Sequence, residues 1–230
     1  MDDPDVLRLF RRMEELKRLD HEFDVHGTWT HDSGHRYKSE RVSKAELAQL
    51  ESELGVELPD QCRRWLASVG RGAGPGYGLI CRKGNWLAPL LEDPVPSRTV
   101  RDVSELTPEL LLKFETAREE SNDIDLFGVR SHDGLMPLCE HGCGWESLLI
   151  VAGPMKGHVV DVLVAAGYPL GAFAAGHGTR PGNVLPTFFE WLDDWIERSI
   201  KELPKKRELR RKMREILSTH QEQVRRRKSP

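Results

Sequence analysis

The sequence predicts an α+β fold, in which amphipathic helices pack against antiparallel strands. Apolar residues recur at three- and four-residue spacing near both ends of the chain and over residues 44–69, as in amphipathic helices. The segments 135–140, 146–153 and 158–167 are short apolar runs joined by glycine-bearing links, a pattern typical of an antiparallel meander. With 230 residues, 38% hydrophobic and 31% charged, the chain is long enough for one domain with a sizeable core.

The first helix is expected over residues 4–20, whose apolar residues share one helical face: Val6, Leu9, Phe10, Met13 and Leu16. Residues 20–41 are polar, contain glycines and lack a hydrophobic period, so we expect a solvated linker or mobile arm there. Residues 1–42 are therefore interpreted as an N-terminal helix followed by a polar arm.

Two short helices are predicted next. Ser43 and Glu46 have the spacing of a capping box, so a helix should begin at about Lys44. Gly55 is well placed to end that helix in the left-handed conformation. Pro59 is expected to begin a second helix, whose buried stripe would be formed by Cys62, Trp65, Leu66 and Val69.

A stretch with five glycines, VGRGAGPGYGLI at residues 69–80, follows the second helix. It contains neither G-x-G-x-x-G nor a P-loop, and it leads from a helix into a predicted strand at residues 77–82. Phosphate-binding loops run in the opposite direction, from strand to helix, so that the helix N-terminus faces the anion. We therefore interpret the stretch as a tight connection shaped by Gly70, Gly74 and Gly76, leading to paired strands at 77–82 and 86–90.

A last helix and a basic tail end the chain. Thr187 and Glu190 form a second capping box, before a buried face of Phe188, Trp191, Leu192, Trp195 and Ile196. That helix should close a domain of residues 43–202. Residues 203–230 are predicted to be a basic helical tail with a narrow apolar stripe, formed by Leu209, Met213, Ile216 and Leu217.

The charge is unevenly distributed. Residues 201–230 hold twelve Lys or Arg against four Glu, so the net charge of −3 leaves −11 on residues 1–200. An acidic body suits a cationic partner and opposes nucleic acid as its ligand. The tail alone could bind nucleic acid, an acidic protein or an anionic surface, although a charge run is more often a solvated helix.

Metal and catalytic motifs are weak. Cys139, His141 and Cys143 are all zinc-competent, with a fourth ligand to come from Cys81 or His158, but C-x-H-x-C is not a common zinc spacing. Buried structural cysteines are the favoured interpretation, and a zinc-binding module stays open as an alternative. There is no G-x-S-x-G and no zinc-deaminase motif, so we expect no catalytic site and no cofactor.

Neither a targeting segment nor a membrane span is predicted. The N-terminus carries acidic residues where a signal peptide has basic ones, and no apolar run approaches the roughly 18 residues of a spanning helix. The four cysteines are too few to indicate a disulfide framework, so we expect reduced thiols and a cytoplasmic location.

A resemblance to the SUKH superfamily is carried by the block ELAQLESELGVELPDQCRRWLASVGRGAGPGYGLI. This superfamily contains fungal cell-wall-synthesis regulators and many bacterial immunity proteins. The block combines a leucine-rich helix, the turn Leu54-Gly55-Val56, Leu58-Pro59, Trp65-Leu66 and the glycine stretch. The segments LMPLCEHGCGWESLLIVAGPMKGHVV and TFFEWLDDWI extend the resemblance over residues 43–198. It departs from the family at Cys62, where an aromatic residue is common, and at Arg71, where G-N-G is common.

The resemblance implies a twisted, mainly antiparallel sheet with packed helices, used to bind proteins rather than to catalyse. Bacterial members neutralise a toxin, commonly a nuclease or nucleobase deaminase, and occlusion of the toxin is the expected mechanism. The partner would be a basic cognate toxin, contacted by exposed residues beside the glycine stretch: Tyr77, Trp86, Glu92 and Asp93. Aromatic residues such as Tyr77 and Trp86 are more often part of the core, which is the alternative for these two. No membrane partner is expected. A regulatory scaffold or nucleic-acid-associated protein acting through the tail is the alternative.

Overall fold

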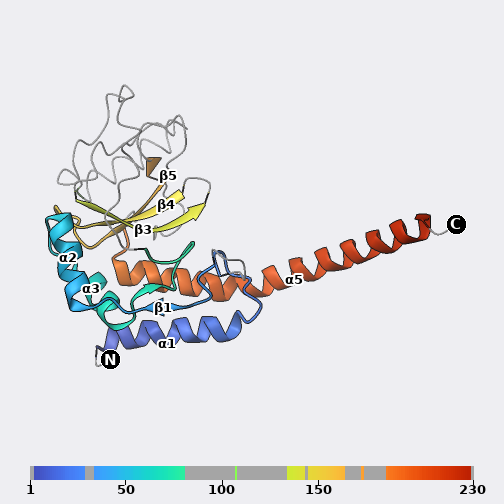
Figure 1. Cartoon of the computed structure of the whole chain (residues 1–230), viewed down its shortest axis with the longest axis horizontal. Coiled ribbons are helices and arrows are strands. Elements are labelled where there is room, and N and C mark those ends of the chain that lie inside the picture. The colour runs from blue at the N-terminus through green and yellow to red at the C-terminus, as the bar shows by residue number, and fades with distance from the viewer. Residues whose placement is uncertain are drawn as a thin grey trace, which may run out of the picture.

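The computed structural model of the chain describes residues 3–28, 34–80, 107, 134–142, 145–163, 172–173 and 185–228. The helices are α1 (Pro4–Leu19), α2 (Lys44–Leu54), α3 (Asp60–Ser68) and α5 (Phe188–Lys228). The strands are β1 (Ser39–Glu40), β2 (Arg71–Gly72), β3 (Leu135–Gly142), β4 (Trp145–Ile150), β5 (Val159–Leu163) and β6 (Ala172–Phe173). Figure 1 shows α1 and the first half of α5 running alongside each other beneath the β3–β5 sheet. The α+β prediction is confirmed.

The strand meander predicted from the sequence is also confirmed. The larger sheet has the order β3-β4-β5-β6, with every neighbouring pair antiparallel. In this register Glu140 lies opposite Glu146, and Ser147 lies opposite Asp161. A second, two-stranded sheet pairs β1 with β2, so the segment after α1 is joined to the start of the glycine stretch.

Helix boundaries follow the capping residues expected from the sequence. Ser43 and Glu46 form the complete capping box of α2, and Gly55 ends that helix at φ 71°. The Thr187 amide donates to the Glu190 carboxylate over 3.0 Å at the start of α5. The predicted apolar helix faces, which include Cys62 and Trp65, are buried in one core cluster. The same cluster includes Val6 and Leu9 of α1. Helix α1 therefore belongs to the same core as residues 43–202.

The interpretation of residues 20–41 as a solvated linker or mobile arm is wrong for the described part. Asp20, Val25, Thr28 and Tyr37 are all buried, and residues 39–40 form β1. The segment has no hydrophobic period because its ordering depends on buried polar groups that hydrogen-bond to one another.

The basic tail is helical, as predicted, but it is a direct continuation of the last helix. Helix α5 runs through Pro204 without a break and extends far beyond the rest of the described chain (Figure 1). Pro204 lacks the amide that would donate to the Ile200 carbonyl, which normally weakens a helix interior. Leu203 is 2% exposed, so burial of the residue before the proline helps to hold this part of α5 in place. Among the described residues, no helix is long and apolar enough to cross a membrane.

Candidate functional site

The glycine stretch is fixed against the edge of β3. The Tyr77 amide donates to the Glu140 carbonyl over 2.8 Å, and the Ile80 amide donates to the Leu138 carbonyl over 2.7 Å. Gly76 has φ 54°, and a Cβ there would overlap the Glu140 carbonyl. The stretch is therefore a tight connection, as predicted, and glycine at 76 is required by this close approach. The strand predicted over residues 77–82 is wrong for the described residues 77–80, where Leu79 forms only an isolated bridge with Gly72.

Gly70 and Gly74 have related roles. Gly70 has φ 111°, and a Cβ there would overlap the backbone of Glu40. At Gly74 a Cβ would lie 2.8 Å from Cγ of the buried Leu79 side chain. These two glycines allow the stretch to pass close to the segment before α2 and to fold back on itself.

Tyr77 is displayed by this stretch at the end of β3. Its side chain is 36% exposed, and its ring centroid lies 5.3 Å from that of His26. Its hydroxyl lies beside Gly142, where an added Cβ would be 3.1 Å away. Trp86, Glu92 and Asp93, the other contact residues expected from the resemblance, lie outside the described residues, as do the predicted strand at 86–90 and Cys81.

Cys139 and His141, the proposed zinc ligands, lie together in a hydrogen-bonded network. The distance from Cys139 Sγ to His141 Nε2 is 3.4 Å, and His141 Nε2 lies 2.7 Å from Ser147 Oγ. The Ser147 hydroxyl donates to the Asp161 carboxylate. Since Ser147 donates to Asp161, its oxygen accepts from His141 Nε2, which therefore carries the proton.

The network positions His141 rather than activating a nucleophile. Ser147 and Cys139 are each 0% exposed, and Ser147 gives its proton to a carboxylate instead of to the imidazole. Cys143 lies outside the described residues. In the part of the chain that the structure describes, no group of three or more His, Cys, Asp and Glu side chains is placed to hold a metal ion.

A pocket of about 330 Å³ opens beside this network. Its walls come from the segment after α1, the glycine stretch, the sheet and α5, and they include His26, Gly76, His141, Asp161, Arg198 and Lys206. His26 is held there because its Nε2 lies 2.9 Å from the His141 carbonyl. The pocket mixes both signs of charge, so its walls do not indicate a purely anionic or cationic ligand.

Two carboxylates face one another across β3 and β4, at the same end of β3 as Tyr77. Glu140 is exposed and Glu146 is half-buried. Burial, together with the negative charge of Glu140, raises the pKa of Glu146 to about 7. This acid pair was not singled out from the sequence, although its cross-strand position follows from the antiparallel register of β3 and β4.

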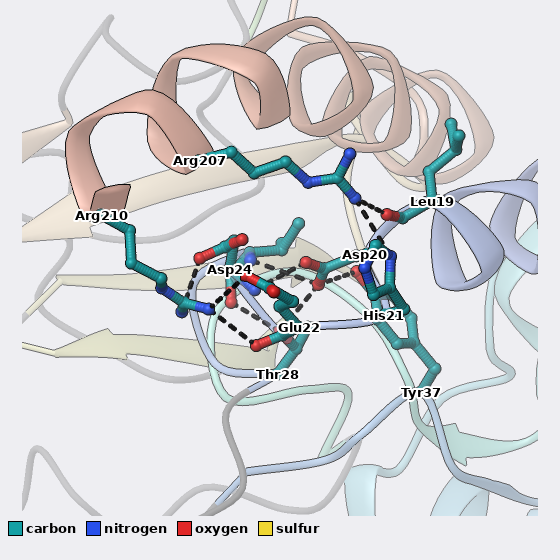
Figure 2. A network of polar contacts seen from close by, with 10 residues as sticks. Leu19, Asp20, His21, Glu22, Asp24, Thr28, Tyr37, Arg207 and Arg210 are labelled. Carbon is teal, nitrogen blue, oxygen red and sulfur yellow. Dashed lines mark hydrogen bonds and ion pairs between the residues drawn. The ribbon is translucent and has the colours of Figure 1, made fainter. Parts of the chain in front are cut away.

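Helix α5 is anchored to the segment after α1 by two arginines, which Figure 2 shows reaching from one face of the helix. Arg207 donates to the Leu19 carbonyl. Arg210 donates to the Glu22 carbonyl over 3.1 Å and lies 2.5 Å from the Asp24 carboxylate. These contacts cross the predicted boundary between body and tail, so they fix the direction in which α5 leaves the body.

Asp20 organises the segment that the arginines contact (Figure 2). Its carboxylate accepts from the Asp24 amide at 2.6 Å, the Val25 amide at 3.2 Å, the Thr28 hydroxyl at 3.0 Å and the Tyr37 hydroxyl at 2.8 Å. Burial, with the Asp20 carboxylate as acceptor, raises the pKa of Tyr37 above its usual range. The network thereby holds His26 in place for its contact with Tyr77.

From Leu209 onward, α5 carries a row of large apolar side chains in solvent. Leu209, Met213, Ile216 and Leu217 are 61%, 55%, 68% and 57% exposed. Apart from Tyr77, these are the exposed large hydrophobic residues of the described chain. The structure thus offers two surfaces for partners, one at Tyr77 on the body and one on the distal part of α5.

Comparison of the chain with protein-family models and with curated protein sequences finds no match. The resemblance to the SUKH superfamily therefore rests on the sequence motifs described above.

Proposed function

We propose that the protein is a non-catalytic, cytoplasmic immunity protein, which binds a cognate toxin of the nuclease or nucleobase deaminase type and occludes it. The toxin class comes from the resemblance to the SUKH superfamily. The structural observation that supports protein binding is the rigid display of Tyr77 at the end of β3.

Tyr77 has the properties of an interface anchor. Tyrosine, with tryptophan and arginine, dominates binding energy at protein interfaces, above all where the side chain is ordered before binding. The Tyr77 backbone is fixed by its hydrogen bond to Glu140, and its ring contacts His26. Among the described residues between 3 and 203, Tyr77 is the one large hydrophobic residue whose side chain is exposed. A partner could therefore bury it at a small cost in conformational entropy.

The acid pair at the same end of β3 supports a cationic partner. Burial is the main cause of the raised pKa of Glu146, and repulsion by Glu140 across the strands adds to it. A Lys or Arg of the partner placed between them would relieve this repulsion and favour the ionised form of Glu146. Proteins that act on nucleic acid carry such basic side chains, and the body of this chain has the complementary charge of −11 over residues 1–200.

The proposal is tested by capture followed by growth rescue. The tagged full chain is purified from its source cells, and any protein present in near-equal amount is identified. That protein is then expressed in a heterologous host with and without this chain. The immunity proposal predicts that the captured protein stops growth when expressed alone and that co-expression with this chain restores growth.

Two variants test whether Tyr77 forms part of the surface that binds the captured protein. Tyr77→Ala should lose capture and rescue, whereas Glu53→Gln, an exposed change on α2, should keep both. A captured protein that is harmless alone would contradict the immunity role. Full rescue by Tyr77→Ala would contradict the assignment of this surface.

A further inference from the structure

The distal part of α5 has the spacing of a helix-on-helix seam. Leu209, Met213, Ile216 and His220 are all exposed, and they are separated by steps of four, three and four residues. Such alternation matches the a and d positions of a heptad, at which knobs of one helix fit into holes of another. These residues form what we name the α5 seam, about 16 Å long at the helical rise of 1.5 Å per residue.

Lysines flank the α5 seam on one side. With Leu209 and Ile216 at d positions, Lys205 and Lys212 fall at g positions. The e positions hold the exposed Leu217 and Arg210, and Arg210 is already paired with Asp24 of the body. The glutamates of the same stretch, Glu208 and Glu215, lie outside these flanking positions and pair with Arg211 on their own helix. Glu208 also lies 3.4 Å from Lys212, where both side chains are exposed, so this pair is weak. Residues at e and g face the flanks of a partner helix, so their charge selects the partner.

This charge pattern disfavours a second copy of the chain. In a parallel pair Lys205 would face Arg210 of the other copy, and in an antiparallel pair lysines would face lysines. Residues 201–230 carry a surplus of eight positive charges, so two such helices side by side would also repel each other over their whole length. A helix with acidic e and g positions would instead meet Lys205 and Lys212 on the g flank, within a stretch of positive net charge.

A membrane surface and a nucleic acid fit the α5 seam less well than a helix does. Helices that lie on membranes present a wide apolar face, commonly with aromatic anchors, whereas the α5 seam is narrow and its apolar members are Leu209, Met213 and Ile216. Nucleic-acid binding would use the cationic residues but not the exposed apolar side chains between them.

We propose that the α5 seam is a second binding surface, which takes an acidic amphipathic helix of a partner protein through a short heterotypic coiled coil. Arg207 and Arg210 anchor the helix to the body at the start of the seam, so the seam is presented at a fixed direction from Tyr77. The proposal does not depend on the immunity function, because it concerns a different surface and the opposite sign of charge.

The test uses fluorescently labelled synthetic helical peptides of about four heptads and the full-length chain. One peptide has Leu at a and d with Glu at e and g. A second keeps the Glu residues but has Ser at a and d, and a third keeps the Leu residues but has Lys at e and g. Fluorescence anisotropy is recorded at physiological salt for the wild-type chain, for Ile216→Ser, and for Ser218→Ala on the opposite side of the helix. Circular dichroism verifies that both variants keep the helix.

The first peptide should bind with a dissociation constant in the micromolar range, and the other two should bind at least about tenfold more weakly. Ile216→Ser should weaken binding of the first peptide about tenfold, and Ser218→Ala should leave it unchanged. Equal binding of the Glu/Leu and Glu/Ser peptides would overturn the proposal, since charge alone would then suffice. Two further results would overturn the proposal. One is self-association of the chain that is abolished by Ile216→Ser. The other is seam-dependent binding to phosphatidylglycerol vesicles or duplex DNA, with no binding to the peptides.

Discussion

Arg210 Nη2 lies 2.5 Å from Asp24 Oδ1, and the Asp24 side chain is only 4% exposed. This ion pair joins the far side of Pro204 to the segment after α1, two regions separated by most of the sequence (Figure 2). The other carboxylate oxygen of Asp24 is buried and has no hydrogen-bond partner among the described residues. Asp24 therefore depends on Arg210 to compensate its buried charge.

Removal of Arg210 should destabilise the protein more than removal of the neighbouring arginine. Arg210→Ala leaves the Asp24 carboxylate buried and unpaired, so we expect the free energy of unfolding to fall by about 2 kcal/mol. Among the described residues Arg211 pairs with the exposed Glu208 and Glu215 of its own helix and with no buried group, so Arg211→Ala should leave stability unchanged. Urea unfolding of both variants measures the difference, and equal losses would show that the anchor has no special role.

The phenol of Tyr37 should resist ionisation in the folded protein. Its pKa is raised by burial and by the Asp20 carboxylate, so the neutral form is favoured in the folded state. Its contribution to stability is complete below the unfolded value of about 10 and is lost as the pH rises above it. Absorbance at alkaline pH should show one tyrosine that ionises only on unfolding. Tyr37→Phe should remove that late phase and cost about 1 kcal/mol, since the hydrogen bond is lost.

Glu146 should make the protein less stable at neutral than at acidic pH. Its folded pKa is about 7, above its ordinary value of 4.5, so the folded state binds the proton more tightly than the unfolded state. Stability should therefore fall between about pH 4.5 and pH 7 and then level off. Because the side chain is only half-buried, we expect Glu146→Gln to gain only on the order of 1 kcal/mol at pH 8 and nothing near pH 4.

Urea unfolding of wild type and Glu146→Gln at a series of pH values checks this expectation. A stability difference that does not change with pH would contradict it. Glu140→Gln provides the control, because loss of the Glu140 charge should lower the pKa of Glu146 and shrink the pH dependence.

Substitution of Gly76 should be far more damaging than substitution of Gly55. Both have positive φ, at 54° and 71°, so both replacements by alanine incur backbone strain of about 1 kcal/mol. At Gly55 nothing lies within 4 Å of an added Cβ, but at Gly76 the Glu140 carbonyl occupies that space. We expect Gly76→Ala to cost about 3 kcal/mol and to displace Tyr77. Thermal unfolding of the two variants measures this, and similar losses would show that the glycine stretch is not held tightly against β3.

The sequence predicted the parts of the fold that depend on local signals. Capping residues such as Ser43 and Thr187 located the helix starts, and short glycine links indicated the antiparallel order of β3 to β5. It failed for residues 20–41, because the order of that segment comes from contacts of Asp20 with Thr28 and Tyr37 that no hydrophobic period reveals.

The candidate site was only partly accessible from the sequence. Tyr77 and the glycines that display it could be identified from the density of glycine and from the family resemblance. The acid pair of Glu140 and Glu146 depends on strand register, and the anchoring of α5 by Arg210 depends on a contact between distant segments. The sequence of a run of charged residues does not indicate which of its arginines will pair with a buried carboxylate.

The measurement that tests the central claim most directly is the affinity of the captured toxin for wild type and Tyr77→Ala, by isothermal titration calorimetry at low and high salt. The account predicts a tight one-to-one complex whose affinity falls at least about a hundredfold in Tyr77→Ala. It also predicts that added salt weakens the wild-type complex, because a basic partner meets the acid pair. Unchanged affinity in Tyr77→Ala, together with no effect of salt, would contradict it.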